Sequence, residues 1–294
     1  MRLQRTIKKE VTFRGIGLHT GKYATVRLKP ASRDTGIVFY RSDKGALIRA
    51  TLSSIVDTAF ATTIGFDGIK VKTVEHLLAA AAGLGIDNLL IDIDGPEVPI
   101  LDGSSTDLVG IMLEAGIAKQ GKKRPYIKIT RPVVYEDAHS RIVALPYDDM
   151  RISYSINFNH HILSHQELTV DLNEKNFIKD IAPARTFGFL RDVEMLRANG
   201  LAKGGSLDNA VVVGDEGVLN ASGLRFSDEF VRHKILDAIG DMSLIGYPIQ
   251  GHIMLEKSGH TSNMLFLKKL LNSIDSFSIL SEVDHLSSQV LNYS

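Results

Sequence analysis

The sequence predicts an α+β fold built from two related halves. Its opening third reads as strands separated by turns, helical patterns follow, and strands return from about residue 126 before a second set of helices. A run of charge, glycine and proline at 121–125 divides the two sets. We therefore expect an N-terminal α+β domain over 1–123, a C-terminal α+β domain over 124–270 and a tail over 271–294.

The elements of the first half follow from periodicity and turn residues. Apolar and polar side chains alternate over 23–29, which predicts a half-buried strand. We expect a helix over about 73–82, a buried strand over 88–93 and a second helix over 102–115. Gly116 is placed to end that helix, because glycine readily takes the backbone conformation found after a helix C-terminus.

The second half repeats this theme. We expect strands from 126–129 to about residue 156, a helix near 187–198, a strand over 210–213, a helix over about 228–245, and a strand over 253–255 followed by a polar loop at 257–261. The first and second halves therefore predict two similar layers of helix and strand.

The composition excludes several classes of protein. A hydrophobic content of 44% over 294 residues is enough to fill proper cores, and the 34 basic and 34 acidic residues cancel. We therefore expect no nucleic-acid partner. The start of the chain lacks the apolar core of a signal peptide, and the apolar stretch at 77–86 is too short to span a bilayer. We expect a cytoplasmic protein without integral membrane association.

The chain has no cysteine, so any metal site must use histidine and carboxylate ligands. Two segments, 73–76 and 233–241, supply them. His76, His233 and Asp237 are the ligand set of a catalytic zinc ion that keeps one coordination position open for water. In a helix, the i and i+4 spacing of the second segment brings its histidine and aspartate to one face.

The same segments carry further acids and bases. Asp241 stays near the ligand face, one helical turn beyond Asp237. Glu75 is beside His76 and is placed to take a proton from a metal-bound water. A metal-dependent hydrolase is the function that this combination favours.

Each residue also has a more ordinary interpretation. A lone histidine such as His76 is more often hydrogen-bonded within a helix, Glu75 is more often a solvated carboxylate, and His233 with Asp237 forms a common polar pair. The occurrence of both segments in one chain favours the metal site. Two histidines and one carboxylate also suit ferrous iron, so Fe²⁺ is the alternative to Zn²⁺, with oxygen chemistry as the alternative activity.

Five sequence strings resemble one known family, the bacterial UDP-3-O-acyl-N-acetylglucosamine deacetylases, which perform the committed step of lipid A and lipopolysaccharide synthesis. The strings stand in the family's order, and the resemblance covers about residues 1 to 270. They are G-I-G-L-H-T-G at 15–21, T-V-E-H at 73–76, D-G-P-E-V-P-I-L-D-G-S-S at 94–105, A-R-T-F-G-F at 184–189 and H-K-I-L-D-A-I-G-D at 233–241.

The resemblance implies a fold and a reaction. The fold is two β-α-α-β domains that form a two-layer sandwich, with the helices packed between the sheets and the site formed between the domains. The reaction is a zinc-dependent amide hydrolysis that releases acetate from an acylated UDP-sugar. A binding module for the same sugar nucleotide, stabilised by a metal, is the non-enzymatic alternative.

The resemblance also assigns catalytic roles. Glu75 is the general base, and His260 is the general acid that protonates the departing amine, oriented and kept charged by Asp241. Thr186 faces the oxyanion, although a threonine there could instead cap a helix. Lys234 has a substrate-side role, either on phosphate or on the oxyanion.

Substrate contacts are implied at further positions. His19 stands at the rim of the active site, Phe158 at the position that stacks on uracil, and Phe187 beside the acyl channel. Asn157 stands where an aspartate is often expected, so the sequence leaves its contact with uridine open. The tail at 271–294, rich in serine and leucine, is interpreted as a segment recognised by a protease.

Overall fold

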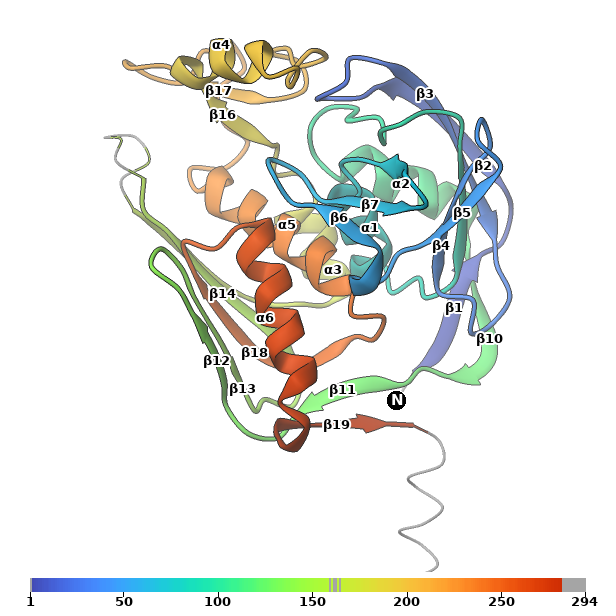
Figure 1. The fold of residues 1–294 in the computed structure, drawn as a ribbon. Helices are drawn as coiled ribbons and strands as arrows, with labels where there is room; N and C mark the ends of the chain where they lie inside the picture. The colour runs from blue at the N-terminus through green and yellow to red at the C-terminus, as the bar shows by residue number, and fades with distance from the viewer. Residues whose placement is uncertain (1, 159, 161–162, 164, 282–294) are drawn as a thin grey trace, which may run out of the picture.

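The structure, a computed structural model, describes residues 2–281 except 159, 161–162 and 164. It contains six α-helices and several sheets, a mixed composition that is compatible with the predicted α+β class. Figure 1 shows one large sheet on each side of the molecule and helices between them. None of the helices in the described part of the chain is both long and apolar enough to cross a membrane.

The first large sheet has five strands, and its strand order is β2-β3-β9-β4-β5. Neighbouring strands are antiparallel except β4 and β9, which run parallel and therefore need a long crossover between them. That crossover contains α1. The strands are β2 (Val11–Ile16), β3 (Tyr23–Pro30), β4 (Ile37–Arg41), β5 (Ala46–Arg49) and β9 (Leu89–Ile93).

The second large sheet has seven strands. Its central strand β18 pairs with β13 in antiparallel fashion and with β11 and β14 in parallel fashion. The strands are β11 (Tyr126–Ile129), β12 (Val133–Glu136), β13 (Arg141–Leu145), β14 (Met150–Ile156), β15 (Gln166–Asp171), β18 (Ile249–Glu256) and β19 (Phe277–Leu280).

Three smaller sheets complete the described strands. The sheet of β6, β7 and β8 leads into α1, and the pair of β16 and β17 lies beside α4 at one end of the molecule (Figure 1). These strands are β1 (Leu3–Ile7) with β10 (Ile117–Lys123), β6 (Ile55–Asp57), β7 (Thr63–Phe66) and β8 (Ile69–Val71), and β16 (Phe187–Phe189) with β17 (Val211–Val213).

The α-helices are α1 (Glu75–Gly83), α2 (Thr106–Ala115), α3 (Glu174–Asn176), α4 (Leu190–Ala198), α5 (Glu229–Ser243) and α6 (His260–Asn272). Short 3₁₀ turns lie at Leu52–Ser54 and Ile274–Ser276, and a π-helical turn lies at Phe177–Ile181. Helix α5 packs against both α1 and α6. These three helices carry most of the candidate catalytic residues.

Close contact between α1 and α5 depends on small residues. Helix α1 has a run of four alanines, and only one of its nine residues is not buried. On α5, a Cβ atom built on Gly240 would lie 2.1 Å from the backbone oxygen of Glu75, far inside van der Waals contact. Glycine is therefore required where the two helices approach.

Several boundaries differ from the sequence prediction. His260, expected in a polar loop, is the first residue of α6, a helix that was not predicted from the sequence. The helix expected near 187–198 begins at Leu190, because Phe187–Phe189 pairs with β17 as a strand. Charged residues up to Lys123 remain in β10, so the break before the second half is confined to 124–125. The domain boundary itself stays a prediction.

Part of the range expected as a tail, 271–294, has secondary structure. Helix α6 continues to Asn272, and Phe277–Leu280 forms β19, which pairs along β11. The first part of the expected tail is therefore built into the seven-stranded sheet. Residues 282–294, where protease recognition was predicted, lie outside the described residues.

Candidate metal and catalytic site

The predicted metal ligands meet where α1 crosses α5. His76 is the second residue of α1, and His233 and Asp237 lie one turn apart on α5. One ligand atom from each lies within 4.8 Å of the others, and all three residues are buried. Nε2 of His76 and Nε2 of His233 lie 3.6 Å and 3.3 Å from Oδ1 of Asp237. This donor set fits a divalent metal ion that accepts imidazole and carboxylate ligands.

His233 is held in an orientation that suits a metal ligand. Its Nδ1 donates to the backbone oxygen of Ala184 at 3.0 Å, which leaves Nε2 directed toward Asp237. Burial lowers the pKa of His233 to about 4, although the charge of Asp237 opposes this. The imidazole is therefore neutral near pH 7, as coordination requires.

The carbonyl of Ala184 is itself fixed by a buried ion pair. Its neighbour Arg185 donates from Nε to Oε1 of Glu229 at 2.8 Å and from Nη2 to Oε2 at 3.1 Å. The backbone N–H of Arg185 also donates to Glu229 at 3.0 Å. Since Glu229 begins α5, this pair ties the segment before β16 to the helix that carries two of the three ligands.

Asp237 lies among histidines and a lysine that favour its ionised form. Burial opposes its ionisation, but His233 and Lys234 hold its pKa well below the usual range. Nζ of Lys234 lies 3.4 Å from Oδ2 of Asp237. Burial would lower the pKa of Lys234, yet Tyr154 and Asp237 outweigh it and raise that pKa. Lys234 is thus a fixed cation at the edge of the metal ligands.

Glu75, the first residue of α1, lies immediately beside the ligands. Its side chain is almost wholly buried, and its Oε2 accepts from the backbone N–H of Thr62 at 3.0 Å. Burial raises the pKa of Glu75 to about 7, with His260 and His76 acting in the opposite direction. A carboxyl group with a pKa near neutrality is suited to accept and release a proton.

His260 faces the same region from the start of α6. Its Nδ1 lies 2.8 Å from Oδ2 of Asp241, a fully buried carboxylate. Burial would lower the pKa of His260, but the charge of Asp241 and its hydrogen bond outweigh this and raise the pKa to about 9. His260 is therefore protonated near pH 7, and 11% of its side chain remains exposed.

Thr186 does not cap a described helix. It precedes β16, its backbone N–H donates to Gly103 O at 2.8 Å, and its carbonyl accepts from Val211 N at 2.8 Å. Thr186 is half-buried. It lies two positions after Ala184, whose carbonyl accepts from His233. The structure thus brings its backbone near the metal ligands.

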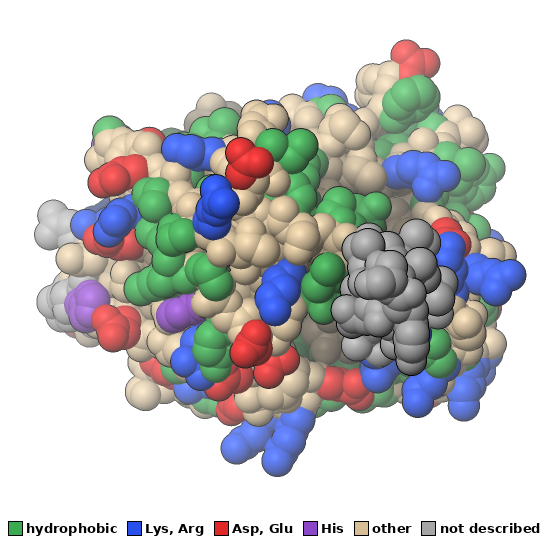
Figure 2. Space-filling model, turned by 90° about the horizontal axis from the view of Figure 1, so that it is seen from below, with side chains coloured by type: hydrophobic (Ala, Val, Ile, Leu, Met, Phe, Trp, Pro, Cys, Tyr) green, Lys and Arg blue, Asp and Glu red, His purple; other side chains and the backbone are tan. Residues whose placement is uncertain are grey.

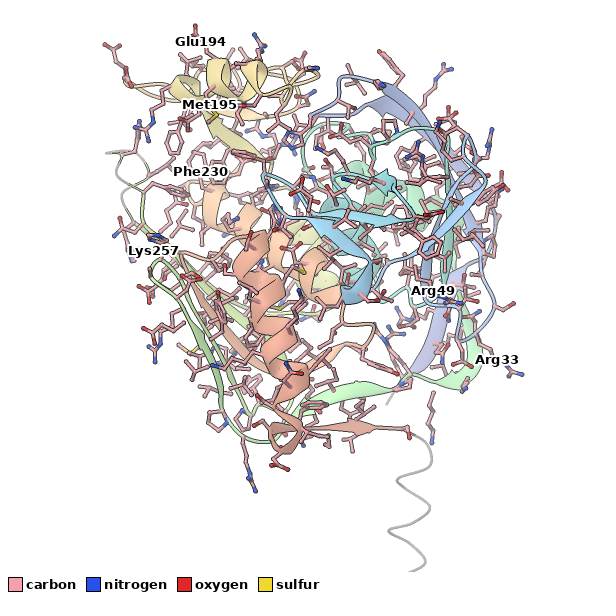
Figure 3. The ribbon with its side chains drawn as sticks, in the orientation of Figure 1. Arg33, Arg49, Glu194, Met195, Phe230 and Lys257 are labelled. Carbon is pink, nitrogen blue, oxygen red and sulfur yellow. The ribbon has the colours of Figure 1, made fainter. Side chains whose placement is uncertain are left out.

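Aromatic side chains extend from the ligands toward α4. The ring of Phe187 is 6.2 Å from the ring of His233, 5.0 Å from Phe230 and 5.9 Å from Phe158, in edge-on contacts. Figure 3 labels Phe230 on α5, with Met195 on α4 beyond it. The predicted substrate-contact residues Phe158 and Phe187 therefore lie together, and Asn157 beside them is exposed.

His19 is buried, and its two ring nitrogens have no hydrogen-bond partner among the described residues. Burial lowers the pKa of His19, Glu97 opposes this, and Lys72 and His260 lower it further. The backbone N–H groups of His19 and Thr20 donate to the two carboxylate oxygens of Glu97 at 2.8 Å and 2.7 Å. Glu97 therefore holds the glycine-rich loop in place.

Several residues of this site were not predicted from the sequence. Glu97, Arg185 and Gly240 lie within strings that the sequence had singled out, so their positions were a usable signal. Thr62 and Asn263 had no such signal, because their contacts are made across elements distant in the sequence.

Comparison with known proteins finds one family. The chain matches the family described as UDP-3-O-acyl N-acetylglycosamine deacetylase over residues 4–272. A relative named UDP-3-O-acyl-N-acetylglucosamine deacetylase, from Thermodesulfovibrio yellowstonii, is 57% identical over 273 residues, which is 93% of each chain.

Two further relatives carry the same name. The protein from Syntrophotalea carbinolica is 49% identical over 279 residues, which cover 94% of this chain and 90% of the relative. The protein from Geobacter sp. strain M21 is 47% identical over 282 residues, which cover 95% of this chain and 92% of the relative. The similarity therefore includes every element that contributes to the candidate site.

Proposed function

The chain belongs to the UDP-3-O-acyl-N-acetylglucosamine deacetylase family, and from this premise we propose that it hydrolyses the N-acetyl group of a UDP-3-O-acyl-N-acetylglucosamine. The products are acetate and UDP-3-O-acyl-glucosamine, in the committed step of lipid A biosynthesis. The observation that carries the proposal is the buried cluster of His76, His233 and Asp237. The carboxyl group of Glu75 and the charged imidazole of His260 lie close to this cluster.

In this proposal His76, His233 and Asp237 would hold a Zn²⁺ ion. When bound, the ion would supply a Lewis acid able to lower the pKa of a water to about 7 and to polarise an amide carbonyl. The neutral state of His233 and the ionised state of Asp237 support the assignment, since both are the ligand forms.

Glu75 is the general base. Its burial beside His76 and the single N–H donor from Thr62 leave it able to take a proton from the attacking water at neutral pH. Its position at the first residue of α1 keeps it adjacent to a ligand on the same helix.

His260 is the general acid. Its Nδ1 is engaged by Asp241, so Nε2 is the atom that donates a proton to the nitrogen of the breaking amide bond. The carbon–nitrogen bond breaks, the amine leaves with this proton, and acetate is released. Glu75 takes up a proton near neutral pH and His260 holds one to donate, so the two groups divide the proton transfers.

Two more side chains stabilise the negative charge that develops on the acetamide oxygen. Thr186 contributes its hydroxyl, and Lys234 contributes a cation already fixed beside Asp237. For substrate binding we propose that Phe158 stacks on uracil, Phe187 borders the acyl chain, and His19 contacts the sugar nucleotide at the rim. The contacts among the aromatic rings support a shared substrate surface.

We also propose two related β-α-α-β domains, over 1–123 and 124–270, that hold the site between them. Helix α1 lies in the first range and α5 in the second, which supports this division. Figure 2 shows basic and acidic side chains interspersed over one face of the molecule. A cytoplasmic location fits the sugar nucleotide substrate.

The proposal is tested by incubating the purified protein with UDP-3-O-acyl-N-acetylglucosamine without oxygen and measuring acetate and free amine. Equal amounts of both products support the hydrolysis. A reaction that requires oxygen would favour the ferrous-iron alternative, and tight substrate binding without either product would favour a binding module.

A further inference from the structure

Thr62 connects three parts of the candidate site. It lies directly before β7, and it is 0% exposed. Its backbone N–H donates to Oε2 of Glu75 at 3.0 Å, and its hydroxyl donates to Oδ1 of Asp241 at 2.6 Å. Its carbonyl accepts from the N–H of Val74, the residue before α1, at 3.2 Å. Thr62 therefore bridges the start of α1 and the later part of α5.

We propose that Thr62 is a positioning residue, which aligns Asp241 for His260 and holds Glu75 in the same frame. This inference rests on the proposed function, in which Glu75 is the base and His260 is the acid. It assigns a role in proton transfer to a residue whose described hydrogen bonds reach Glu75, Asp241 and Val74 and none of the three metal ligands.

The hydrogen bonds of Asp241 explain why one hydroxyl matters. Oδ2 accepts from His260 Nδ1 at 2.8 Å and from Asn263 Nδ2 at 2.8 Å, whereas Oδ1 accepts from Thr62. Asp241 is 0% exposed, so solvent does not replace a missing donor. The plane of the carboxylate, and with it the direction of the imidazole, depends on a donor at each oxygen.

The side chain of threonine suits this position. A hydroxyl bond to a carboxylate at 2.6 Å has the length of a strong, charge-assisted hydrogen bond. The β-branched side chain has restricted rotation about χ1, so the hydroxyl is held in one direction. A second tie supports the same loop, since Thr58 Oγ1 lies 2.8 Å from Oγ1 of Thr261 next to His260.

A purely structural link between α1 and α5 is the competing explanation. The variant Thr62→Val distinguishes this explanation from the proposed positioning role. Valine keeps the branched shape and the backbone N–H that donates to Glu75, but it lacks the hydroxyl. Thr62→Ser restores the hydroxyl with less packing. Thr63→Val is the matched control, since Thr63 is 1% exposed and none of its described contacts reaches Glu75 or Asp241.

The experiment measures kcat and KM for acetate release, metal content and thermal midpoint for each variant. We expect kcat of Thr62→Val to fall by about 10-fold to 100-fold, less than the roughly 10²-fold to 10⁴-fold of losing a general acid or base outright, with KM changed by less than about twofold. Thr62→Ser should recover most of the loss, and Thr63→Val should match the unmodified chain. If Thr62→Val fails to fold, Thr62→Ala supplies the same deletion without the second methyl group.

A double-mutant cycle with Asp241→Asn tests the route of the effect. If Thr62 acts through Asp241, adding Thr62→Val to Asp241→Asn should lower kcat by less than about twofold more. Fully additive losses, a serine variant as slow as the valine variant, or an unchanged kcat in Thr62→Val would each overturn the inference. Absence of acetate release from the unmodified chain would instead refute the proposed function, and the inference with it.

Discussion

Nδ1 of His260 lies 2.8 Å from Oδ2 of Asp241, although the two residues belong to different helices. The contact fixes the orientation of the imidazole and engages one of its two nitrogens. It also keeps the ring charged, since the pKa of His260 is raised to about 9 despite burial. The pair accounts for an acid that is available at neutral pH, and it makes the reaction sensitive to alkaline pH.

Turnover should decline as pH rises through about 9, where His260 loses its proton. In Asp241→Asn, burial still lowers the pKa of His260 and the largest opposing charge is gone, although Glu75 and Asp237 still raise that pKa, so this alkaline limb should move to lower pH. Profiles of kcat against pH for both proteins measure the shift. An alkaline limb unmoved by Asp241→Asn would mean that another group controls it.

The same pair predicts how stability depends on pH. The pKa of His260 in the folded chain is above its ordinary value of 6.5, so its stabilising effect is fully present below about pH 6.5 and is lost as pH rises through about 9. Urea unfolding between pH 6 and 10 should show this loss in the unmodified chain. Asp241→Asn should flatten that part of the profile, whatever its effect on overall stability.

Glu75→Gln should keep the metal and lose most turnover. The amide oxygen of glutamine still accepts from the N–H of Thr62, but the side chain no longer takes up a proton. We expect kcat to fall by about 100-fold or more, as for removal of a general base. His76→Ala is the comparison, since it should lose bound metal as well. Metal analysis beside kinetics distinguishes the two, and a fully active Glu75→Gln would remove the proposed base.

Gly240→Ala should destabilise the fold and disturb the ligands together. The added Cβ would lie 2.1 Å from the backbone oxygen of Glu75, so α1 and α5 must separate. Overpacking of this kind costs about 1–3 kcal/mol in the free energy of unfolding. The matched control is Gly110→Ala on α2, where a Cβ meets no atom within 4 Å and alanine should stabilise the helix by about 0.5–1 kcal/mol. Equal urea midpoints for both variants would contradict the close approach.

Glu229→Gln should weaken both the fold and the metal site. It leaves the buried guanidinium of Arg185 without its carboxylate, a change that costs about 3–5 kcal/mol when one partner of a buried pair is removed. Movement of Arg185 also shifts the carbonyl of Ala184 away from His233, so metal affinity should fall by about 10-fold or more.

Glu136→Gln provides the control for this variant, because Glu136 and its partner Arg141 are both exposed and lie 3.8 Å apart. Its unfolding and metal affinity should match those of the unmodified chain. Equal metal affinity in Glu229→Gln and Glu136→Gln would show that the buried pair does not position the ligand.

The sequence predicted the parts of this site that lie close together along the chain. His233 and Asp237 are one helical turn apart, so helical periodicity placed that pair, and Glu75 directly adjoins His76 in the sequence. The meeting of His76 with the second pair needs the packing of α1 on α5. That packing depends on Gly240 and the alanines of α1, and no local pattern in the sequence identifies its geometry.

The errors have a similar origin. The residues before His260 read as a polar loop, and the following helix was missed although it carries buried apolar side chains at Met264, Phe266 and Leu267. Phe277–Leu280 was assigned to a tail because serine surrounds it, yet β11 offers it a strand edge for pairing. In both cases a partner distant in the sequence decides the structure.

The most direct test of the central claim is acetate release from UDP-3-O-acyl-N-acetylglucosamine after chelation and after stoichiometric Zn²⁺ is restored, under anaerobic conditions. The proposed mechanism predicts that activity disappears with the metal and returns with zinc, while His76→Ala stays inactive throughout. Acetate release that continues undiminished in the metal-free protein, or no release in either state from folded, zinc-loaded protein, would contradict it.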